Sequence, residues 1–257
     1  MHARANRHRV SNYAGPLSIK TVLSGRVAWM VGGRQLVVDR SSFLVLSDGE
    51  HYSMDIAAAK PVETCCVFFA RGFVEQVALD ATSPLELTLD DPERGAPPLA
   101  YLSALHSDRE CALTTRIHTL ALRCQTALTP SAWEQDFLLI AEALLGLYEE
   151  ICSQSARIPA TRGATRDELF RRLLRGRDYM HSHAAGPVSL ADVARAACVS
   201  PFHFHRGFTC AFGKTPHAYL TALRLAHARE RLETGSSVLE ACLEAGFSSP
   251  SAFSRLF

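Results

Sequence analysis

The sequence predicts a two-domain α+β protein: an N-terminal β-barrel with a pair of helices, then an all-α domain with two helix-turn-helix units joined by a long helix. Three observations support this. Short strand-like segments separated by Gly-containing turns fill residues 17–70. Two stretches with helical spacing of apolar residues follow. One helical pattern then occurs twice, at residues 189–208 and 238–257.

The repeated pattern is the most informative part of the chain. Its first copy reads SLADVARAACVSPFHFHRGF and its second reads VLEACLEAGFSSPSAFSRLF. Both contain a small-residue helix, a short turn and a Ser-Pro pair, which is a strong helix-start signal. A helix, a short turn and a second helix of this size are typical of the helix-turn-helix, whose second helix enters the DNA major groove. Two ordinary helical hairpins are the alternative, but the repeated aromatic–Arg–aromatic spacing favours DNA binding.

The C-terminal region also resembles a known family. The segments SPFHFHRGF, GKTPHAYLTALRLAHARERL and EAGFSSPSAFSRLF are similar to the DNA-binding domain of AraC/XylS-type transcriptional regulators, from about residue 166 to the end. The resemblance implies a joining helix, here at Pro216–Glu233, of about 27 Å. Family members continue with a basic stretch and a final helix. This chain stops at Phe257, so we expect a domain that is incomplete at its end.

Candidate DNA-contacting residues follow from the expected packing and from the resemblance. Phe204 and Phe208 are expected to face the core, so that the residues beside them face outward. The family pattern implies base contacts in the first unit by Phe202, His205 and Arg206, with Thr209 on the same face, and in the second unit by Ser251, Ser254 and Arg255. Arg can contact guanine through two hydrogen bonds, and an aromatic edge can pack on a thymine methyl. The alternative is that the two arginines bind only phosphate.

Charge and composition fit this organisation. Residues 160–257 contain 13 Lys or Arg against 8 Asp or Glu, whereas residues 1–159 contain 14 against 18. A basic module attached to an acidic one is typical of a DNA-binding domain joined to another domain. The 8 cysteines include no CxxC pair and read as buried apolar residues. Without an apparent export signal or membrane span, we expect a cytoplasmic protein that does not contact the membrane.

The N-terminal region is expected to form a small barrel. Residues 1–12 are expected to be a disordered basic terminus. The strands predicted after it are Leu17–Leu23, Arg26–Val31, Arg34–Asp39, Ser42–Leu46, His51–Ile56 and Pro61–Ala70, with a short helix at Phe73–Leu79 and a further strand at Glu86–Leu89. The phrase FLVLSDGEHYSMDI resembles a motif of the cupin-like sensor domain of many AraC-type regulators. The His-x-His pair of metal-dependent cupins is absent, so we expect no metal site, no cofactor and no enzymatic activity.

A barrel of this size can enclose one small molecule. The candidate ligand-binding residues are Trp29, His51 and Tyr52. For His51 the alternative is an ordinary hydrogen-bonded residue at a turn. For the aromatic residues the alternative is the barrel core.

Two helices, Thr115–Thr126 and Ser131–Cys152, are expected to pack on the barrel as a hairpin. The resemblance implies that they also form a homodimer, for which Leu144 is a candidate interface residue. The expected domains are therefore 1–152, for sensing and dimerisation, and 166–257, for DNA binding. The small polar residues 153–165 are expected to form the linker between them.

The sequence therefore predicts a sequence-specific transcriptional regulator controlled by a small molecule or partner in the barrel. The resemblance implies an activator that contacts promoter DNA and RNA polymerase. The alternatives are a cupin-type enzyme fused to a DNA-binding tail, a regulator controlled by protein contacts alone, and a truncated regulator that acts only by dimerisation. The residues identify neither the effector nor the operator.

Overall fold

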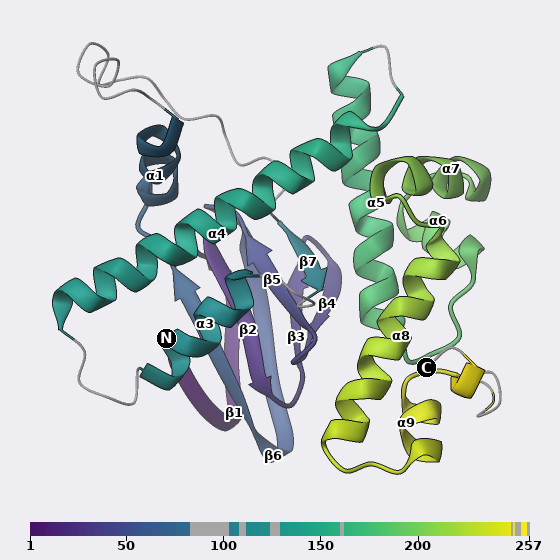
Figure 1. The fold of residues 1–257 in the computed structure, drawn as a ribbon, viewed down its shortest axis with the longest axis horizontal. Coiled ribbons are helices and arrows are strands. Elements are labelled where there is room, and N and C mark those ends of the chain that lie inside the picture. Colours follow the sequence, from purple (N-terminus) through teal and green to yellow (C-terminus); the bar gives the residue numbers. More distant parts are fainter. Residues whose placement is uncertain are drawn as a thin grey trace. The chain divides into compact units, whose positions relative to one another are not determined.

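The fold is taken from a computed structural model, which describes residues 1–82, 103–107, 112–123, 129–159, 162–247, 249 and 253–255. The chain divides into two compact units, Met1–Ile151 and Cys152–Phe257. The first contains the β-sheet with its accompanying helices and the second is helical, which confirms the predicted fold class (Figure 1). Residues 86–89, where a further strand was expected, lie outside the described residues.

The strands of the first unit mostly follow the expected pattern. They are β1 (His2–Ala14), β2 (Ser18–Ser24), β3 (Val27–Val31), β4 (Arg34–Val38), β5 (Ser42–Leu46), β6 (His51–Phe68) and β7 (Ala104–Ser107). Two expectations were wrong. The basic N-terminus is not disordered but pairs with β6 as β1. Pro61 does not break β6, because it lies beside the irregularity between Ala5 and Arg7, where no ladder hydrogen bond is needed from it.

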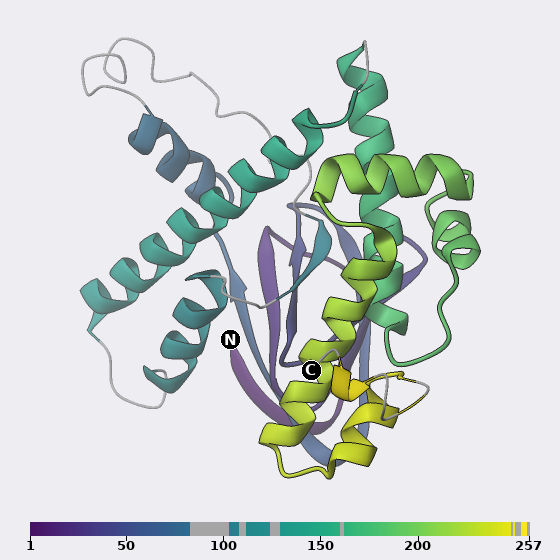
Figure 2. The same ribbon diagram turned by 45° about the vertical axis from the view of Figure 1, so that its right-hand side comes forward.

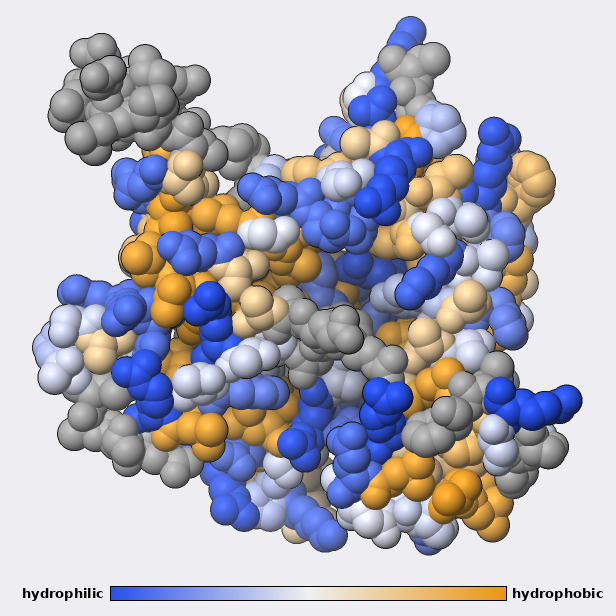
Figure 3. All heavy atoms as spheres, viewed as in Figure 1, coloured by the Kyte–Doolittle hydropathy of each residue, from blue (hydrophilic) through white to orange (hydrophobic). Residues whose placement is uncertain are grey.

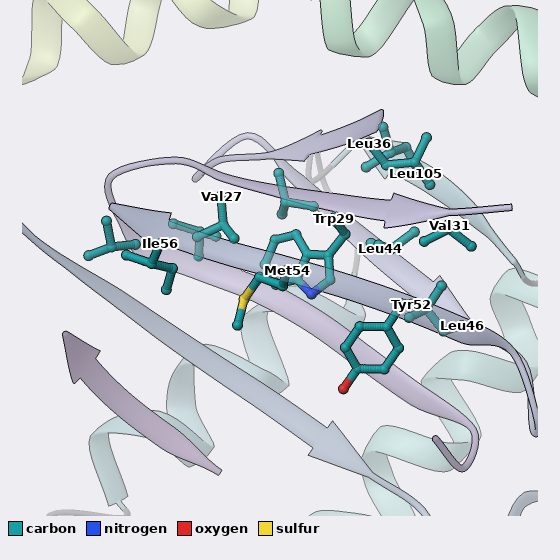
Figure 4. Packing of buried hydrophobic residues seen from close by; sticks show 13 residues of the cluster. Val27, Trp29, Val31, Leu36, Leu44, Leu46, Tyr52, Met54, Ile56 and Leu105 are labelled. Carbon is teal, nitrogen blue, oxygen red and sulfur yellow. The ribbon is translucent and has the colours of Figure 1, made fainter. Parts of the chain in front are cut away.

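The long strand β6 bends the sheet into a nearly closed barrel. The strand order is β4-β3-β6-β2-β5-β7, and β1 pairs with β6 outside this path. The start of β6 pairs with β3 through residues 52–55, and its end pairs with β2 through residues 63–68. Side chains that alternate inward fill the interior with a cluster that includes Trp29, Tyr52 and Met54 (Figure 4).

Helices α1 (Phe73–Thr82), α3 (Ala112–Arg123) and α4 (Pro130–Ala156) accompany the barrel. The ring of Phe137 in α4 packs edge-on against the ring of Phe69, with their centroids 6.1 Å apart. Leu144 is 0% exposed, so it lies in the core and not at a dimer surface. Helix α4 runs to Ala156, and α5 begins at Gly163.

The second unit contains α5 (Gly163–His183), α6 (Leu190–Ala196), α7 (Pro201–Phe212), α8 (Pro216–Glu233) and α9 (Val238–Glu244), with residues 253–255 helical. Helix α8 has the predicted bounds and extends between the α7 and α9 ends of the unit in both ribbon views (Figures 1 and 2). Phe170, Leu173, Phe204 and Phe208 are fully buried, and they fix α7 against α5. No helix of the described part is long and apolar enough to cross a bilayer.

Gly176 allows α5 and α7 to approach closely. A Cβ at this position would lie 2.3 Å from Cε2 of Phe204 and 3.2 Å from Cγ1 of Val193. Because both neighbours are buried in the core, we expect Gly176→Ala to lower the free energy of unfolding of this unit by about 1–3 kcal/mol. Urea unfolding followed by circular dichroism measures the change.

Gly146 in α4 is the matched control, because a Cβ there meets nothing within 4 Å. Gly146→Ala should stabilise its own unit by up to about 1 kcal/mol, through the better helix propensity of Ala. Equal effects of the two substitutions would contradict the packing role of Gly176.

Candidate nucleic-acid interface

The first helices of the two repeats begin in the same way. The Ser189 hydroxyl accepts a hydrogen bond from the Asp192 N–H at 3.2 Å, and the Asp192 carboxylate accepts one from the Ser189 N–H at 3.3 Å. Ser237 and Glu240 make the same reciprocal pair, at 3.3 and 2.9 Å. The pKa of the Asp192 carboxyl group is lowered by hydrogen bonds from the Ser189 hydroxyl and N–H, and that of Glu240 by hydrogen bonds from the Ser237 N–H and hydroxyl. Both capping boxes fix the start of a repeat.

The turns of the two repeats also have the same backbone. Cys198 N–H donates to Arg195 O and Val199 N–H to Ala194 O. The matching bonds of the second turn run from Gly246 to Leu243 and from Phe247 to Cys242. The left-handed position is occupied by Cys198, with φ 55°, in one turn and by Gly246, with φ 86°, in the other. The sequence repeat is therefore a repeat of structure.

The second helices start at the predicted Ser residues. Ser200 caps α7, with Pro201 in the first turn, and its carbonyl accepts from Phe204 N–H at 2.9 Å. Ser249 O accepts from Phe253 N–H at 3.2 Å in the second repeat. Phe253 is buried, as Phe204 and Phe208 are, which confirms the predicted inward positions.

The predicted base-contacting residues of α7 lie on its solvent side. Phe202 is 69% exposed, although it is a large apolar residue, and His205 and Arg206 are exposed beside it. Thr209 is half-buried and donates its hydroxyl to the His205 carbonyl at 2.8 Å. An exposed aromatic ring, an imidazole and a guanidinium therefore share one helix surface, which is suited to base edges in a major groove.

The second repeat is described in part. Ser254 and Arg255 are exposed on the helical residues 253–255, whereas Ser251 lies outside the described residues. The structure thus places two of the three predicted residues of this unit on an accessible helix.

Several basic residues of α5 and α8 have structural roles. Arg177 is buried in α5. Arg224 is half-buried, donates to the carbonyls of Ala184 and Gly186, and has its pKa lowered by burial. Arg231 pairs with Glu244. Arg229 is exposed on the same helix and keeps a guanidinium available for phosphate.

The two histidines at the end of α5 differ from each other. His183 is exposed and stacks on Tyr179, as expected of a solvated helix end. His181 is buried, and its Nε2 lies 2.9 Å from the hydroxyl of Tyr219 in α8. His181 therefore links two helices of the core.

In the barrel, the three candidate ligand-binding residues do not lie together. Trp29 and Tyr52 point into the interior cluster (Figure 4). His51 precedes Tyr52 in β6 and therefore faces the other side. It is exposed, and its Nδ1 lies 3.1 Å from Oδ1 of Asn12. His51 thus has the environment of an ordinary hydrogen-bonded turn residue.

Lys20, which the sequence pattern does not single out, is 1% exposed. Its ammonium donates to the Tyr52 hydroxyl at 3.2 Å and lies 3.8 Å from the centre of the Phe68 ring. Within the described part of the chain, Tyr52 is its one hydrogen-bond partner and no carboxylate pairs with it. Burial lowers the pKa of Lys20 to about 8 and raises that of Tyr52 to about 12. Lys20 lies between Ser18 and Val22 on the inward face of β2.

Comparison with known proteins identifies the C-terminal region. Residues 193–257 match the family model described as a helix-turn-helix domain. The chain is 42% identical over 69 residues to the bifunctional transcriptional activator/DNA repair enzyme Ada of Escherichia coli K12, covering 27% of this chain and 20% of Ada. It is 32% identical over 74 residues to YbfI of Bacillus subtilis 168, an HTH-type transcriptional regulator, covering 29% of this chain and 27% of YbfI. The chain thus spans about a fifth to a quarter of these relatives.

Solved structures align over more of the chain but with low similarity. An apo form of ToxT from Vibrio cholerae, solved as a point variant, is 12% identical, covering all of this chain and 92% of ToxT, with a TM-score of 0.40. The AraC-like transcriptional activator CuxR is 14% identical, covering 89% of this chain and 71% of CuxR, with a TM-score of 0.34. Similarity at this level transfers neither function nor ligand.

The repeated capping boxes, matching turns and buried aromatic residues agree with the family match over residues 193–257. Residues 193–257 of this chain therefore form a helix-turn-helix domain.

Proposed function

We propose that the chain is a sequence-specific, DNA-binding transcriptional regulator in which both helix-turn-helix units contact one DNA site. The observation that carries the proposal is the surface of α7. Burial of Phe204 and Phe208 fixes the helix, and Phe202, His205 and Arg206 stay exposed on it. A large exposed aromatic residue beside a cation is suited to a groove with thymine methyls and phosphates.

The joining helix supports recognition by both units. Helix α8 has 18 residues, a length of about 27 Å, which can hold two recognition helices close to one DNA turn apart. We assign Phe202, His205 and Arg206 to base contacts in one groove and Arg255, with Ser251 and Ser254, to the next. Short Ser side chains reach few base edges, so the first unit supplies most of the specificity.

Substitution of Arg206 tests most directly whether α7 contacts bases. It makes no hydrogen bond or ion pair with another described residue, so its removal should leave the fold intact. Arg206→Ala should weaken binding to the selected operator by about 1–3 kcal/mol, while binding to random DNA changes little. Fluorescence anisotropy over a salt series measures both affinities.

Arg229→Ala is the matched control, since it removes one exposed charge from α8. It should weaken specific and random binding alike and reduce the salt slope by about one. If Arg206→Ala behaves in the same way, Arg206 contacts phosphate and does not read bases.

We further propose that the chain forms a homodimer through α3 and α4. Leu122 in α3 and Leu138 in α4 are 71% and 42% exposed. Hydrophobic residues also reach the surface in the region of α1 and α4 (Figure 3). A two-fold interface would cover these leucines and pair two DNA-binding domains.

Leu138→Glu should therefore yield monomers in sedimentation velocity, because a carboxylate would be buried at the interface. Leu239→Glu is the control. It changes a Leu on α9 that is 55% exposed and lies far along the chain, and it should leave the dimer intact. A dimer that survives Leu138→Glu would rule out this face.

For control by an effector, we propose a small carboxylate bound at Lys20. A buried ammonium with one neutral hydrogen-bond partner is costly, and an anion would offset that cost. The Ser18 hydroxyl on the same face of β2 is also buried, without a partner among the described residues. Lys20, Tyr52 and Ser18 together could donate to one carboxylate, with the apolar cluster around its tail. Since that cluster packs the interior, the ligand must displace side chains, and control by protein contacts alone is the rival.

Lys20→Met tests this assignment. A panel of short and medium-chain monocarboxylates should raise the melting temperature of the wild-type barrel at pH 7 and not that of the variant. The native pKa of Lys20, about 8, lies below its unfolded value, so the unfolded state binds more protons between about pH 8 and 10.5. Wild-type stability should therefore rise with pH across that window, and the carboxylate effect should fade there.

Lys20→Met should be the more stable protein at pH 7 without ligand, because no buried charge remains. Equal carboxylate shifts in both proteins would contradict the proposed site.

Activation is the direction we propose for transcription, with contact to RNA polymerase in the cytoplasm. Its support is the name of the E. coli relative, a transcriptional activator, whose match to this chain covers the DNA-binding region. A cupin-type enzyme is the weaker alternative. Among the described residues no group of three or more His, Cys, Asp or Glu could hold a metal ion.

A further inference from the structure

The turn that ends α5, residues 184–186, is held by the joining helix. Arg224 in α8 donates from Nε to Ala184 O at 2.8 Å and from Nη2 to Gly186 O at 2.7 Å. These carbonyls follow the last helical residue, His183, and carbonyls at a helix end lack partners within the helix. A guanidinium fork that binds two of them fixes the turn relative to α8.

The second helix-turn-helix touches the same turn from another side. A Cβ on Gly246 would lie 2.6 Å from Ala184 O and 2.9 Å from Ala185 O. Both are backbone atoms, so no side-chain movement would relieve the clash. The Gly246 backbone therefore packs directly against residues 184–186.

Comparison of the two turns shows that this contact is specific to the second one. Cys198 occupies the equivalent position with φ 55° and keeps an exposed side chain. A left-handed backbone alone therefore does not exclude a side chain here. At Gly246 the neighbouring carbonyls do exclude it.

The contact lies between two packing cores of the helical unit. Helix α5 belongs to the core of the first helix-turn-helix, where Phe170 stacks on Phe212 and Gly176 contacts Phe204. The second helix-turn-helix has its own core of Ala228, Cys242, Ala245 and Phe253. Helix α8 connects the two cores, and residues 184–186 form a second connection between them.

We propose that Arg224 and Gly246 are positioning residues that lock the two helix-turn-helix units at one spacing and angle. This inference rests on the proposed DNA-binding function. A helix that joined the units alone would let the second unit tilt about its end, whereas a contact off the helix axis removes that freedom. A rigid pair presents its second recognition helix at high effective concentration, but only to half-sites with the matching separation. The contact of Arg224 and Gly246 with residues 184–186, here called the joint, would therefore determine which half-site spacing is recognised, although neither residue contacts a base.

The test uses the full chain and DNA selected from a random library by the wild-type protein. Affinity is measured for the selected bipartite site, for versions with one, two or three base pairs inserted between the half-sites, and for each half-site alone. The wild type should lose at least about tenfold in affinity on insertion of two base pairs. Arg224→Ala should bind the original site about tenfold more weakly, tolerate the insertions with under about threefold loss, and bind the first half-site as the wild type does.

Three further variants make the outcome decisive. Arg229→Ala, which removes an exposed charge from the same helix, should keep the wild-type dependence on spacing. Arg224→Lys keeps the charge but cannot reach both carbonyls as a fork, and should lie between the wild type and Arg224→Ala. Gly246→Ala, which leaves Arg224 in place, should relax the spacing as Arg224→Ala does.

Circular dichroism should show that Arg224→Ala and Gly246→Ala are folded. If both folded variants depend on half-site spacing as the wild type does, the proposed role of the joint is contradicted, and the proposal of DNA binding is unaffected. Loss of first half-site binding in both variants would overturn that role too, because the residues would then support the fold and not the spacing. Failure of the wild-type chain to select any sequence would instead overturn the proposed function, and the joint with it.

Discussion

The contact between the Phe204 ring and Gly176 determines how the DNA-binding surface is presented. The ring occupies the place that a side chain on α5 would take, since a Cβ at Gly176 would lie 2.3 Å from it. With Phe204 and Phe208 held inward, the period of the helix places Phe202, His205 and Arg206 outward. The exposed residues follow from the buried ones, so the packing of α7 on α5 underlies each DNA contact proposed for α7.

The sequence specified the local parts of this domain well. Ser200 caps α7 as its Ser-Pro pair predicts, and α8 spans the predicted residues. Such signals act over three or four residues, so they can be recognised in a sequence. The roles of Arg224, Arg177 and His181 could not be predicted from the sequence. Each depends on a partner or a burial that only the packed helices create, and a basic residue on a predicted helix looks the same whether it faces solvent or a carbonyl.

The barrel shows the same division between local and long-range effects. Gly turns and alternating apolar residues predict the strands, and β2 to β5 lie where expected. The pairing of β1 along β6 could not be predicted, because a polar strand becomes stable through its neighbour and not through its own pattern. Lys20 was missed because its neighbours in β2 are all buried, so the strand has no clean polar side to mark its inward face. His51, the residue that a motif singled out, is exposed, and the unusual group in the interior is Lys20.

The two helix-turn-helix units are proposed to bind one DNA site together, and footprinting tests this most directly. Hydroxyl-radical footprints of the wild-type chain on selected DNA should show two protected segments about 10 base pairs apart on one face of the duplex, as expected for successive major grooves. They should remain distinct at salt concentrations that remove binding to random DNA. A single protected segment, or protection that disappears at the same salt concentration on selected and random DNA, would contradict the account.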